Sequence, residues 1–391
     1  MLQLCPILFL FLANSITFSA SVNSSERGSQ IGPSQRMLRV MTFNIWLSGK
    51  RVKNGLEKIA EQIKAVDPDI VAIQELQSAV IGINLTILLG IGKWKMIYHP
   101  NAAYPDTAII TKHKFISEPI AMQFQRDISD FLFHEENFFN HSIVTYGVGG
   151  SIELEDGQRV NVFSMHLDWK SYGPYAANNK QVKSEKQIMS GERNKEGYGR
   201  AQNIEQLLEN DKFKKFNDLS EEQPFIVAGD FNSPSHLDWI EETKENHGGW
   251  TFEWPATKLL ADKGFVDSYR FVNPDLVKNP GVTWSTVQKS AGPEWDWTIP
   301  EPQDRIDFIF FKPNKFFRPI RSEIYAGKNS LRPIPDQWEN DWPSDHYAVI
   351  TDFEISERNG TTQNESKQRN DINGTIVLNG DVVETLENVI N

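Results

Sequence analysis

Cysteine is almost missing from this sequence, with one residue, Cys5, in a chain of 391. An intramolecular disulfide needs two cysteines, and a thiolate zinc site needs several, so both are excluded. Cys5 lies in an apolar N-terminal stretch, and without that stretch the chain has no thiol at all. The remaining chain must be stabilised by burial of apolar side chains, with a bound metal ion as the further possibility.

Long apolar runs are also missing. The run Pro6–Leu12 is too short for a membrane span and suits the central region of a signal peptide over residues 1–21. Small residues follow it at Ser19, Ala20 and Ser21, and we expect cleavage near them. No lysine or arginine precedes the run, which departs from the usual pattern, and the alternative is a short buried N-terminal helix.

Six asparagines fit the Asn-x-Ser/Thr pattern of N-glycosylation: Asn23, Asn84, Asn140, Asn359, Asn364 and Asn373. Together with the N-terminal run they predict a secreted, extracellular glycoprotein. Residues 356–391 are polar, and we expect a mostly disordered, glycosylated tail without an anchor signal. Residues 37–355 remain for one folded domain, which we expect to be a monomer without a permanent membrane anchor.

Positive charge is scarce, because 40 lysines and arginines face 52 aspartates and glutamates, giving a net charge of −12. This disfavours a broad face for polyanions but does not exclude a nuclease, since a bound metal supplies positive charge locally. A basic stretch over residues 170–200 is the exception. It is either a solvated surface or a flap that meets an anionic substrate. Its cations are Lys170, Lys180, Lys183, Lys186, Arg193, Lys195 and Arg200.

Short apolar segments bounded by turn residues or charges predict strands at 38–44, 70–73, 160–165, 225–228, 306–311 and 347–353. Apolar residues at helical spacing predict helices over 52–66 and 200–208, whereas residues 171–175 read as a loop. Several of the strands are apolar on both faces. This is typical of a sheet covered by helices on one side and by a second sheet on the other.

Acids, amides and histidines recur where these strands begin or end: Asn44, Glu75, His166, Asp168, Asp230, Asn232, Asp307, Asp345 and His346. Each has a plain alternative when taken alone, such as a turn residue, a helix cap or a hydrogen-bonded core histidine. Their recurrence instead favours one shared site at the edge of a sheet. Hard oxygen ligands without cysteine favour Mg²⁺, with Mn²⁺ or Ca²⁺ as alternatives.

The six segments that carry these residues, taken in order, have a family resemblance, and four motifs make it specific. The motifs IQE at 73–75, GDFN at 229–232, RIDFIF at 305–310 and SDHYAV at 344–349 resemble the endonuclease/exonuclease/phosphatase superfamily. Deoxyribonuclease I, apurinic endonuclease, inositol polyphosphate 5-phosphatases and neutral sphingomyelinases belong to it. The resemblance covers nearly all of residues 37–355. It implies a deoxyribonuclease I-like four-layer α/β sandwich, in which two packed mixed β-sheets are flanked by helices and the site lies at one end.

The resemblance also implies a role for each residue. Metal binding falls to Glu75, with Asp345 as the second ligand. The catalytic residues would be His166, Asp230, Asn232, Asp307 and His346, and phosphate would be positioned by Asn44 and Asn232. Asp230 would orient or deprotonate the attacking water, His346 held by Asp307 would contact the phosphate, and His166 would stand near the leaving group. Asp168 has no certain counterpart and is a supporting candidate.

The expected function is therefore a secreted, divalent-metal-dependent hydrolase of phosphate esters, a phosphodiesterase rather than a monoesterase. Fold alone does not select the substrate. An extracellular nuclease, a sphingomyelinase-like lipid phosphodiesterase and a phosphatase of small esters all stay open, so the partner is a nucleic acid, a lipid head group or a small molecule. A catalytically inactive secreted binding protein on the same scaffold is the alternative from another class.

Overall fold

The structure, a computed structural model, describes residues 35–101, 103–123, 146–195, 197, 199–290 and 298–356. The expected signal peptide, the tail beyond Ser356 and every glycosylation sequon except that of Asn84 lie outside these residues. Among the described helices, none has the length and apolar character that crossing a membrane requires.

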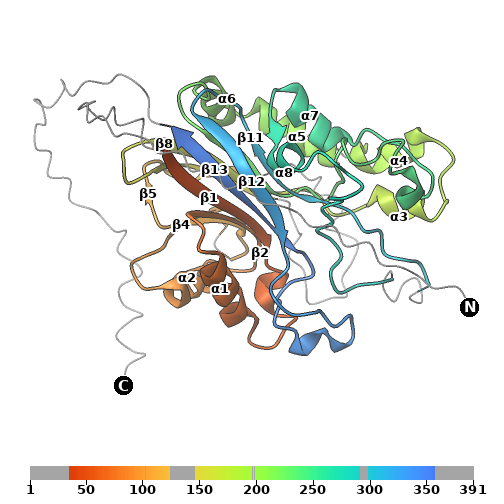
Figure 1. Cartoon of the computed structure of the whole chain (residues 1–391), viewed down its shortest axis with the longest axis horizontal. Helices are drawn as coiled ribbons and strands as arrows, with labels where there is room; N and C mark the ends of the chain where they lie inside the picture. Colours follow the sequence, from red (N-terminus) through yellow and green to blue (C-terminus); the bar gives the residue numbers. More distant parts are fainter. Residues whose placement is uncertain are drawn as a thin grey trace, which may run out of the picture.

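Two mixed β-sheets form the centre of the molecule (Figure 1). Over the described residues the first sheet has the order β12-β13-β1-β2-β4-β3, and the second has the order β10-β11-β9-β8-β7-β5 with β6 beside β7. The strands of the first sheet are β1 (Gln35–Asn44), β2 (Ile70–Leu76), β3 (Lys95–Tyr98), β4 (Asp106–Thr111), β12 (Phe317–Tyr325) and β13 (Ala348–Ser356). Those of the second are β5 (Lys114–Phe115), β6 (Ile120–Gln123), β7 (Tyr146–Glu153), β8 (Arg159–His166), β9 (Phe225–Asp230), β10 (Val266–Asp267) and β11 (Asp307–Phe311).

The central strands are apolar on both faces because each face is covered. In β1, Leu38 and Val40 join the core between the two sheets, whereas Met41 and Phe43 join a second core on the outer face of the first sheet. This alternation follows from the period of two in a strand. A third core lies on the outer face of the second sheet and includes Phe163. The molecule is thus a four-layer α/β sandwich, as the sequence predicted.

Helices form the two outer layers (Figure 1). On the first sheet lie α1 (Gly55–Val66) and α2 (Ala79–Leu89), and on the second lie α5 (Arg200–Glu209), α6 (Asp211–Asp218) and α7 (Pro255–Asp262). A small additional core joins α3 (Gly173–Asn178) and α4 (Glu185–Glu192) to Trp239 and Trp254. The short elements are α8 (Ser268–Val272) and the 3₁₀ turns η1 (Leu47–Gly49), η3 (Lys244–His247) and η5 (Asp336–Glu339).

Two local expectations differ from the structure. The helix expected over 52–66 begins only at Gly55, because Asn54 has a left-handed backbone with φ of 53°. The expected loop at 171–175 contains the start of α3 at Gly173, with Pro174 in the first turn. Proline is accepted there because the first turn of a helix needs no backbone donor.

The strand directions gather the polar residues at one end of the sandwich. β1 runs parallel to β2, and β8 runs parallel to β9, so the carboxyl ends of each pair lie side by side. β4, β11 and β13 run antiparallel to these strands and therefore begin at that same end. The last residues of β1, β2, β8 and β9 therefore lie near the first residues of β4, β11 and β13.

Candidate active site

The expected site residues lie where the strands end or begin. Asn44, His166 and Asp230 are the last residues of β1, β8 and β9, and Asp307 is the first residue of β11. Within the second sheet, Asp230 is paired in register with both His166 and Asp307. The sheet register alone therefore brings these three side chains to one edge.

A single oxygen, Oδ2 of Asp230, is the centre of the site. The amide Nδ2 of Asn44 donates a hydrogen bond to it at 2.9 Å. The Nε2 atoms of His346 and His166 lie 3.6 Å and 3.7 Å from it. The other oxygen, Oδ1, accepts the backbone N–H of Asn232 at 2.8 Å. Because Asp230 is only 1% exposed, its carboxylate is fixed by these partners rather than by bulk water.

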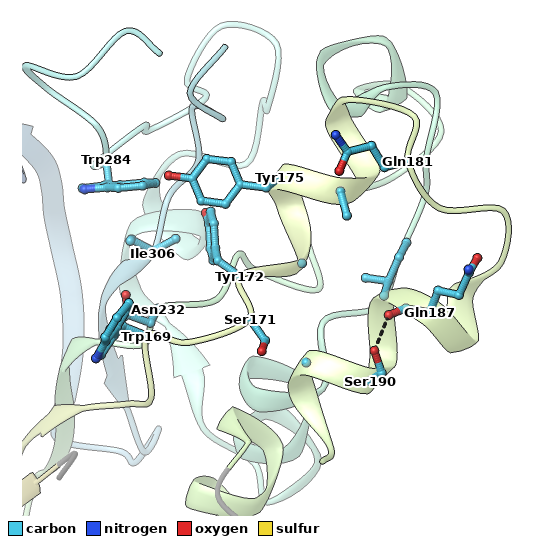
Figure 2. A pocket seen from close by; sticks show the side chains of 14 residues that line it. Trp169, Ser171, Tyr172, Tyr175, Gln181, Gln187, Ser190, Asn232, Trp284 and Ile306 are labelled. Carbon is cyan, nitrogen blue, oxygen red and sulfur yellow. Dashed lines mark hydrogen bonds between the residues drawn. The ribbon is translucent and has the colours of Figure 1, made fainter. Parts of the chain in front are cut away.

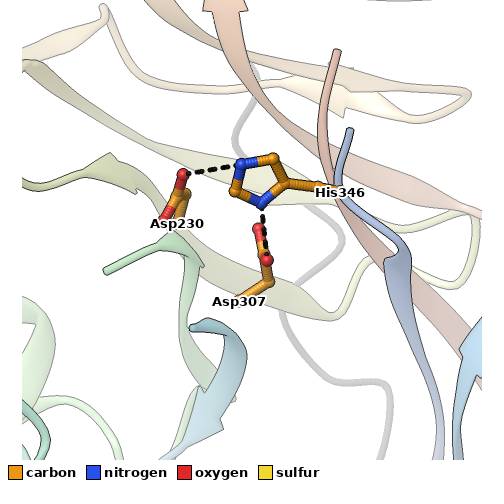
Figure 3. A group of neighbouring side chains, drawn as sticks. All are labelled: Asp230, Asp307 and His346. Atoms are coloured by element: carbon orange, nitrogen blue, oxygen red, sulfur yellow. Dashed lines mark hydrogen bonds and ion pairs between the residues drawn. The ribbon is translucent and has the colours of Figure 1, made fainter. Parts of the chain in front are cut away.

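His346 is held between two carboxylates (Figure 3). Its Nδ1 lies 2.9 Å from Oδ2 of Asp307, while its Nε2 faces Asp230. Burial by itself lowers the pKa of His346, but the charges of Asp307 and Asp230 outweigh it and raise this pKa well above the ordinary value. Burial raises the pKa of Asp307, against the attraction of His346. Two carboxylates beside one buried imidazole thus favour its cationic form.

His166 has a matching partner, Asp106, which the sequence reasoning missed. Nδ1 of His166 lies 2.9 Å from Oδ2 of Asp106, and both side chains are buried. Burial lowers the pKa of His166, but Asp106, and less strongly Asp230, raise it to about 10. The signal for Asp106 was available, because it opens the apolar strand Asp106–Thr111 as Asp307 opens β11.

Glu75 enters the site through an irregularity of its strand. The pairing of β2 with β4 shifts between Gln74 and Leu76, so Glu75 sits in a bulge, and its backbone φ is 64°. Its carboxylate accepts hydrogen bonds from Nδ2 of Asn44 at 3.1 Å and from the backbone N–H of Leu47 at 2.6 Å. A left-handed conformation is costly for a non-glycine residue and is typical of functional sites.

The remaining expected residues support this arrangement. The side-chain Nδ2 of Asn232 donates to the carbonyl oxygen of Leu167 at 2.9 Å, so this amide holds the loop after β9 against the end of β8. Asp168 has its backbone N–H bonded to Asn203 and its carbonyl oxygen bonded to Arg200. Both residues therefore stabilise the loops around Asp230.

The carboxylates fit a divalent cation at two places. One ligand atom from each of Asp230, Asp307 and His346 lies within 4.8 Å of the others, but the Nδ1 of His346 already pairs with Asp307. The second candidate is the pair of Glu75 and Asp345, whose carboxylates are close enough to interact electrostatically. Oδ1 of Asp345 is buried, accepts no hydrogen bond from the described residues, and lies 4.0 Å from Nε2 of His346. Burial raises the pKa of Asp345 most, His346 lowers it, and the charge of Glu75 raises it again, to about 7 overall. A divalent ion would supply the missing partner and offset this repulsion.

The cations of the basic stretch have different environments in the structure, since Arg200 is buried and three of the lysines are exposed. Arg200 is fully buried, lies 2.5 Å from Oε1 of Glu192, and donates to the carbonyl oxygens of Asp168, Lys170 and Ser171. It therefore cannot serve a substrate from the surface. Lys180, Lys183 and Lys186 are exposed on and between α3 and α4.

Comparisons with known proteins identify the family of the chain. The model of the Endonuclease/Exonuclease/phosphatase family matches residues 41–346, a range that contains every site residue described above. An uncharacterized protein of Caenorhabditis elegans is 43% identical over 352 residues, which are 90% of this chain and 99% of that protein. A solved endonuclease/exonuclease/phosphatase family protein from Bacteroides thetaiotaomicron has a TM-score of 0.50 and 16% identity, over 83% of this chain and 97% of that one. That likeness concerns the fold alone.

Proposed function

The chain belongs to the endonuclease/exonuclease/phosphatase family, a family of hydrolases of phosphate esters, and from this premise we propose that it is a secreted, divalent-metal-dependent phosphodiesterase. The observation that supports this best is the convergence of one amide and two imidazoles on one carboxylate oxygen. Asn44, His166 and His346 all face Oδ2 of Asp230.

This arrangement suits the attack of water on phosphorus. Asp230 accepts a proton from the water as the new O–P bond forms, and Asn44 keeps the carboxylate in place. The P–O bond to the leaving group breaks, and His166, protonated through Asp106, donates its proton to the departing oxygen. His346 stays cationic beside Asp307 and stabilises the negative charge that develops on the phosphate oxygens.

Glu75 and Asp345 would hold the metal ion. When bound, a divalent ion stabilises negative charge on the phosphate group. Their oxygen ligands favour Mg²⁺, Mn²⁺ or Ca²⁺ over softer metals.

A diester fits the charge of the site better than a monoester. The site residues named above combine two imidazoles of raised pKa with several carboxylates, and they include no lysine or arginine. A phosphodiester carries one negative charge near neutral pH, whereas a monoester carries ~1.5–2 and needs more cationic partners.

The direct test is a panel of phosphate esters: DNA, RNA, sphingomyelin, inositol phosphates and nucleotides, each with Mg²⁺, Mn²⁺, Ca²⁺ or a chelator. We expect metal-dependent hydrolysis of at least one diester, with loss of activity in the His346→Ala variant. If wild-type protein hydrolyses none of them with any metal, while it still binds one, the inactive binding protein becomes the better description.

Secretion is supported by the N-terminal apolar run and by the sequons. Of the sequons, Asn84 lies within the described residues, exposed on α2, where an attached glycan meets no packed side chain. Expression in eukaryotic secretory cells should give a protein in the medium that begins near Ser21 and carries N-glycans. Detection of a Cys5-containing peptide in the secreted protein would contradict the cleavage.

A further inference from the structure

A cavity of about 580 Å³ opens beside the candidate active site, within the size range of small-molecule sites (Figure 2). Two residues connect it to that site. Asn232 lines the cavity and donates its backbone N–H to Asp230. Trp284 also lines it, and its ring centroid lies 6.2 Å from that of His346. A group attached to a phosphate at His346 is therefore placed to enter the cavity.

One wall of the cavity consists of aromatic rings. Tyr172 and Tyr175 meet edge to face with centroids 5.6 Å apart, and each meets Trp284 at nearly a right angle, at 5.5 Å and 6.5 Å. Their hydroxyl groups donate to buried carboxylates, Tyr172 to Asp304 at 3.2 Å and Tyr175 to Glu301 at 2.5 Å. The rings are thus fixed in place, with their polar ends committed elsewhere. Fixed aromatic surfaces favour stacking against a flat or ring-shaped group.

The opposite wall is polar but uncharged. It carries the side chains of Gln181, Gln187 and Ser190 from α4 and the turn before it (Figure 2). Among the described residues that line the cavity, none is an aspartate, glutamate, lysine, arginine or histidine. Oε1 of Gln187 already accepts the backbone N–H of Lys183, and Oγ of Ser190 donates to the carbonyl oxygen of Gln187. The amide of Gln181, Nε2 of Gln187 and the lone pairs of Ser190 are left to meet a neutral polar group. A charged group moved into the cavity would lose water without gaining an ionic partner.

We propose that this cavity binds the organic part of the substrate, and that this part is an uncharged ring with hydrogen-bonding groups, as in a nucleoside or a sugar. The aromatic wall takes the face of the ring, and the glutamines and Ser190 take its polar edge. The link between this ring and the scissile phosphate rests on the proposed phosphoesterase function, whereas binding of the ring alone does not.

Direct binding tests the cavity without any activity. Ala176 lines the cavity from α3, so Ala176→Phe fills it. Lys212→Phe adds the same ring to exposed α6, outside the cavity lining, and is the matched control. The full chain is titrated with adenosine and with methyl glucoside, followed by saturation-transfer NMR. We expect one of the two to bind wild type and Lys212→Phe equally, with affinity reduced by about tenfold or more in Ala176→Phe. Binding of neither compound, or equal binding by Ala176→Phe, overturns the proposal.

Hydrolysis then separates this proposal from the function on which it rests. The substrates are three methyl phosphodiesters, of a nucleoside, of a hexose and of glycerol, which has no ring. We expect Ala176→Phe to lower kcat/KM for a ring-bearing ester about tenfold more than for the glycerol ester. Equal losses on all three overturn the cavity assignment and leave the phosphoesterase function standing. No hydrolysis by wild type, together with ring binding that Ala176→Phe removes, overturns the function and leaves the cavity.

Discussion

Asp106 on the first sheet lies 2.9 Å from Nδ1 of His166 on the second sheet. In the Asp307–His346 pair the sheets are exchanged. The carboxylate of Asp307 comes from the second sheet, and His346 precedes β13 of the first sheet. Each histidine is therefore oriented by a carboxylate from the facing sheet. The packing of the two sheets, and not only the local loops, sets the direction in which both Nε2 atoms point.

The Asp106–His166 pair predicts a specific dependence on pH. Because the pKa of His166 is raised from 6.5 to about 10, its protonation stabilises the fold fully below pH 6.5, and this contribution is lost as pH rises through about 10. Asp106→Asn removes the largest raising contribution. We expect the free energy of unfolding to fall less between pH 7 and 10 in the variant than in wild type, and the alkaline limb of activity to move to lower pH. Urea unfolding and pH–rate profiles measure both.

The control for this prediction is Asp156→Asn, which removes an exposed carboxylate away from His166. Its pH profiles should match those of wild type. Identical profiles for Asp106→Asn and wild type would show that Asp106 does not govern the charge of His166.

The Asp307–His346 pair predicts a loss of turnover without a loss of fold. Asp307→Asn keeps the shape of the side chain but removes the charge that holds the imidazole cationic. We expect kcat to fall by about 10²–10⁴ while the circular dichroism spectrum stays unchanged. His346→Ala should lose a similar amount. Near wild-type turnover in Asp307→Asn, combined with loss in His346→Ala, would mean that the pairing has no role in the reaction.

Metal removal tests the role of Glu75. We expect EDTA to abolish hydrolysis, and Glu75→Gln to weaken metal binding because a neutral amide replaces a carboxylate beside Asp345. Calorimetric titration of the chelated protein with Mg²⁺ or Mn²⁺ measures this directly. Glu57→Gln, an exposed change on α1, is the matched control. Full activity in chelator for a confirmed substrate would rule out the metal.

The exposed lysines of the basic stretch predict a salt-dependent effect. Replacing Lys180, Lys183 and Lys186 by glutamine removes positive charge from the outside of α3 and α4. We expect KM for an anionic substrate to rise more at about 20 mM salt than at about 300 mM, with kcat unchanged, since screening weakens long-range attraction.

Three lysines near α1 and β3 provide the control for charge alone. Lys64, Lys93 and Lys114 are equally exposed and lie outside the basic stretch, so their replacement by glutamine should leave KM unchanged. If the first triple variant shows the same KM as wild type at low salt, the stretch is a solvated surface only.

Arg200 predicts an effect on stability instead of binding. Arg200→Ala leaves Glu192 buried without its partner and frees three carbonyl oxygens of residues 168–171. We expect a loss of roughly 3–5 kcal/mol in the free energy of unfolding. Glu192→Gln combined with Arg200→Met should lose less, because no buried charge remains. Urea denaturation distinguishes the two variants, and an equally small loss in both would contradict the importance of the pair.

The four-layer sandwich was predicted through the family resemblance, and most of the residues that meet at its end were predicted from the strand ends themselves. A polar residue directly after or before an apolar strand is a local signal, and Asn44, Asp230 and Asp307 all give it. Glu75 also follows an apolar strand segment. Its bulge and its left-handed backbone, however, depend on the pairing of β2 with β4, which the sequence does not show. The roles of these residues in catalysis remain predictions of the family resemblance and of the geometry.

Only the tertiary structure decided which side chains face each other. Asp106 is 60 residues from His166 in the chain and belongs to another sheet, so no spacing within one segment could pair them. The sequence placed Arg200 among the surface cations of the basic stretch. Its burial requires an acidic partner, and that partner, Glu192, comes from a different helix. The cavity wall is another example, since Trp284 and Tyr172 meet through packing of distant segments. The local sequence determines which side chain stands at each strand end, and the packing of the two sheets determines which side chains contact it.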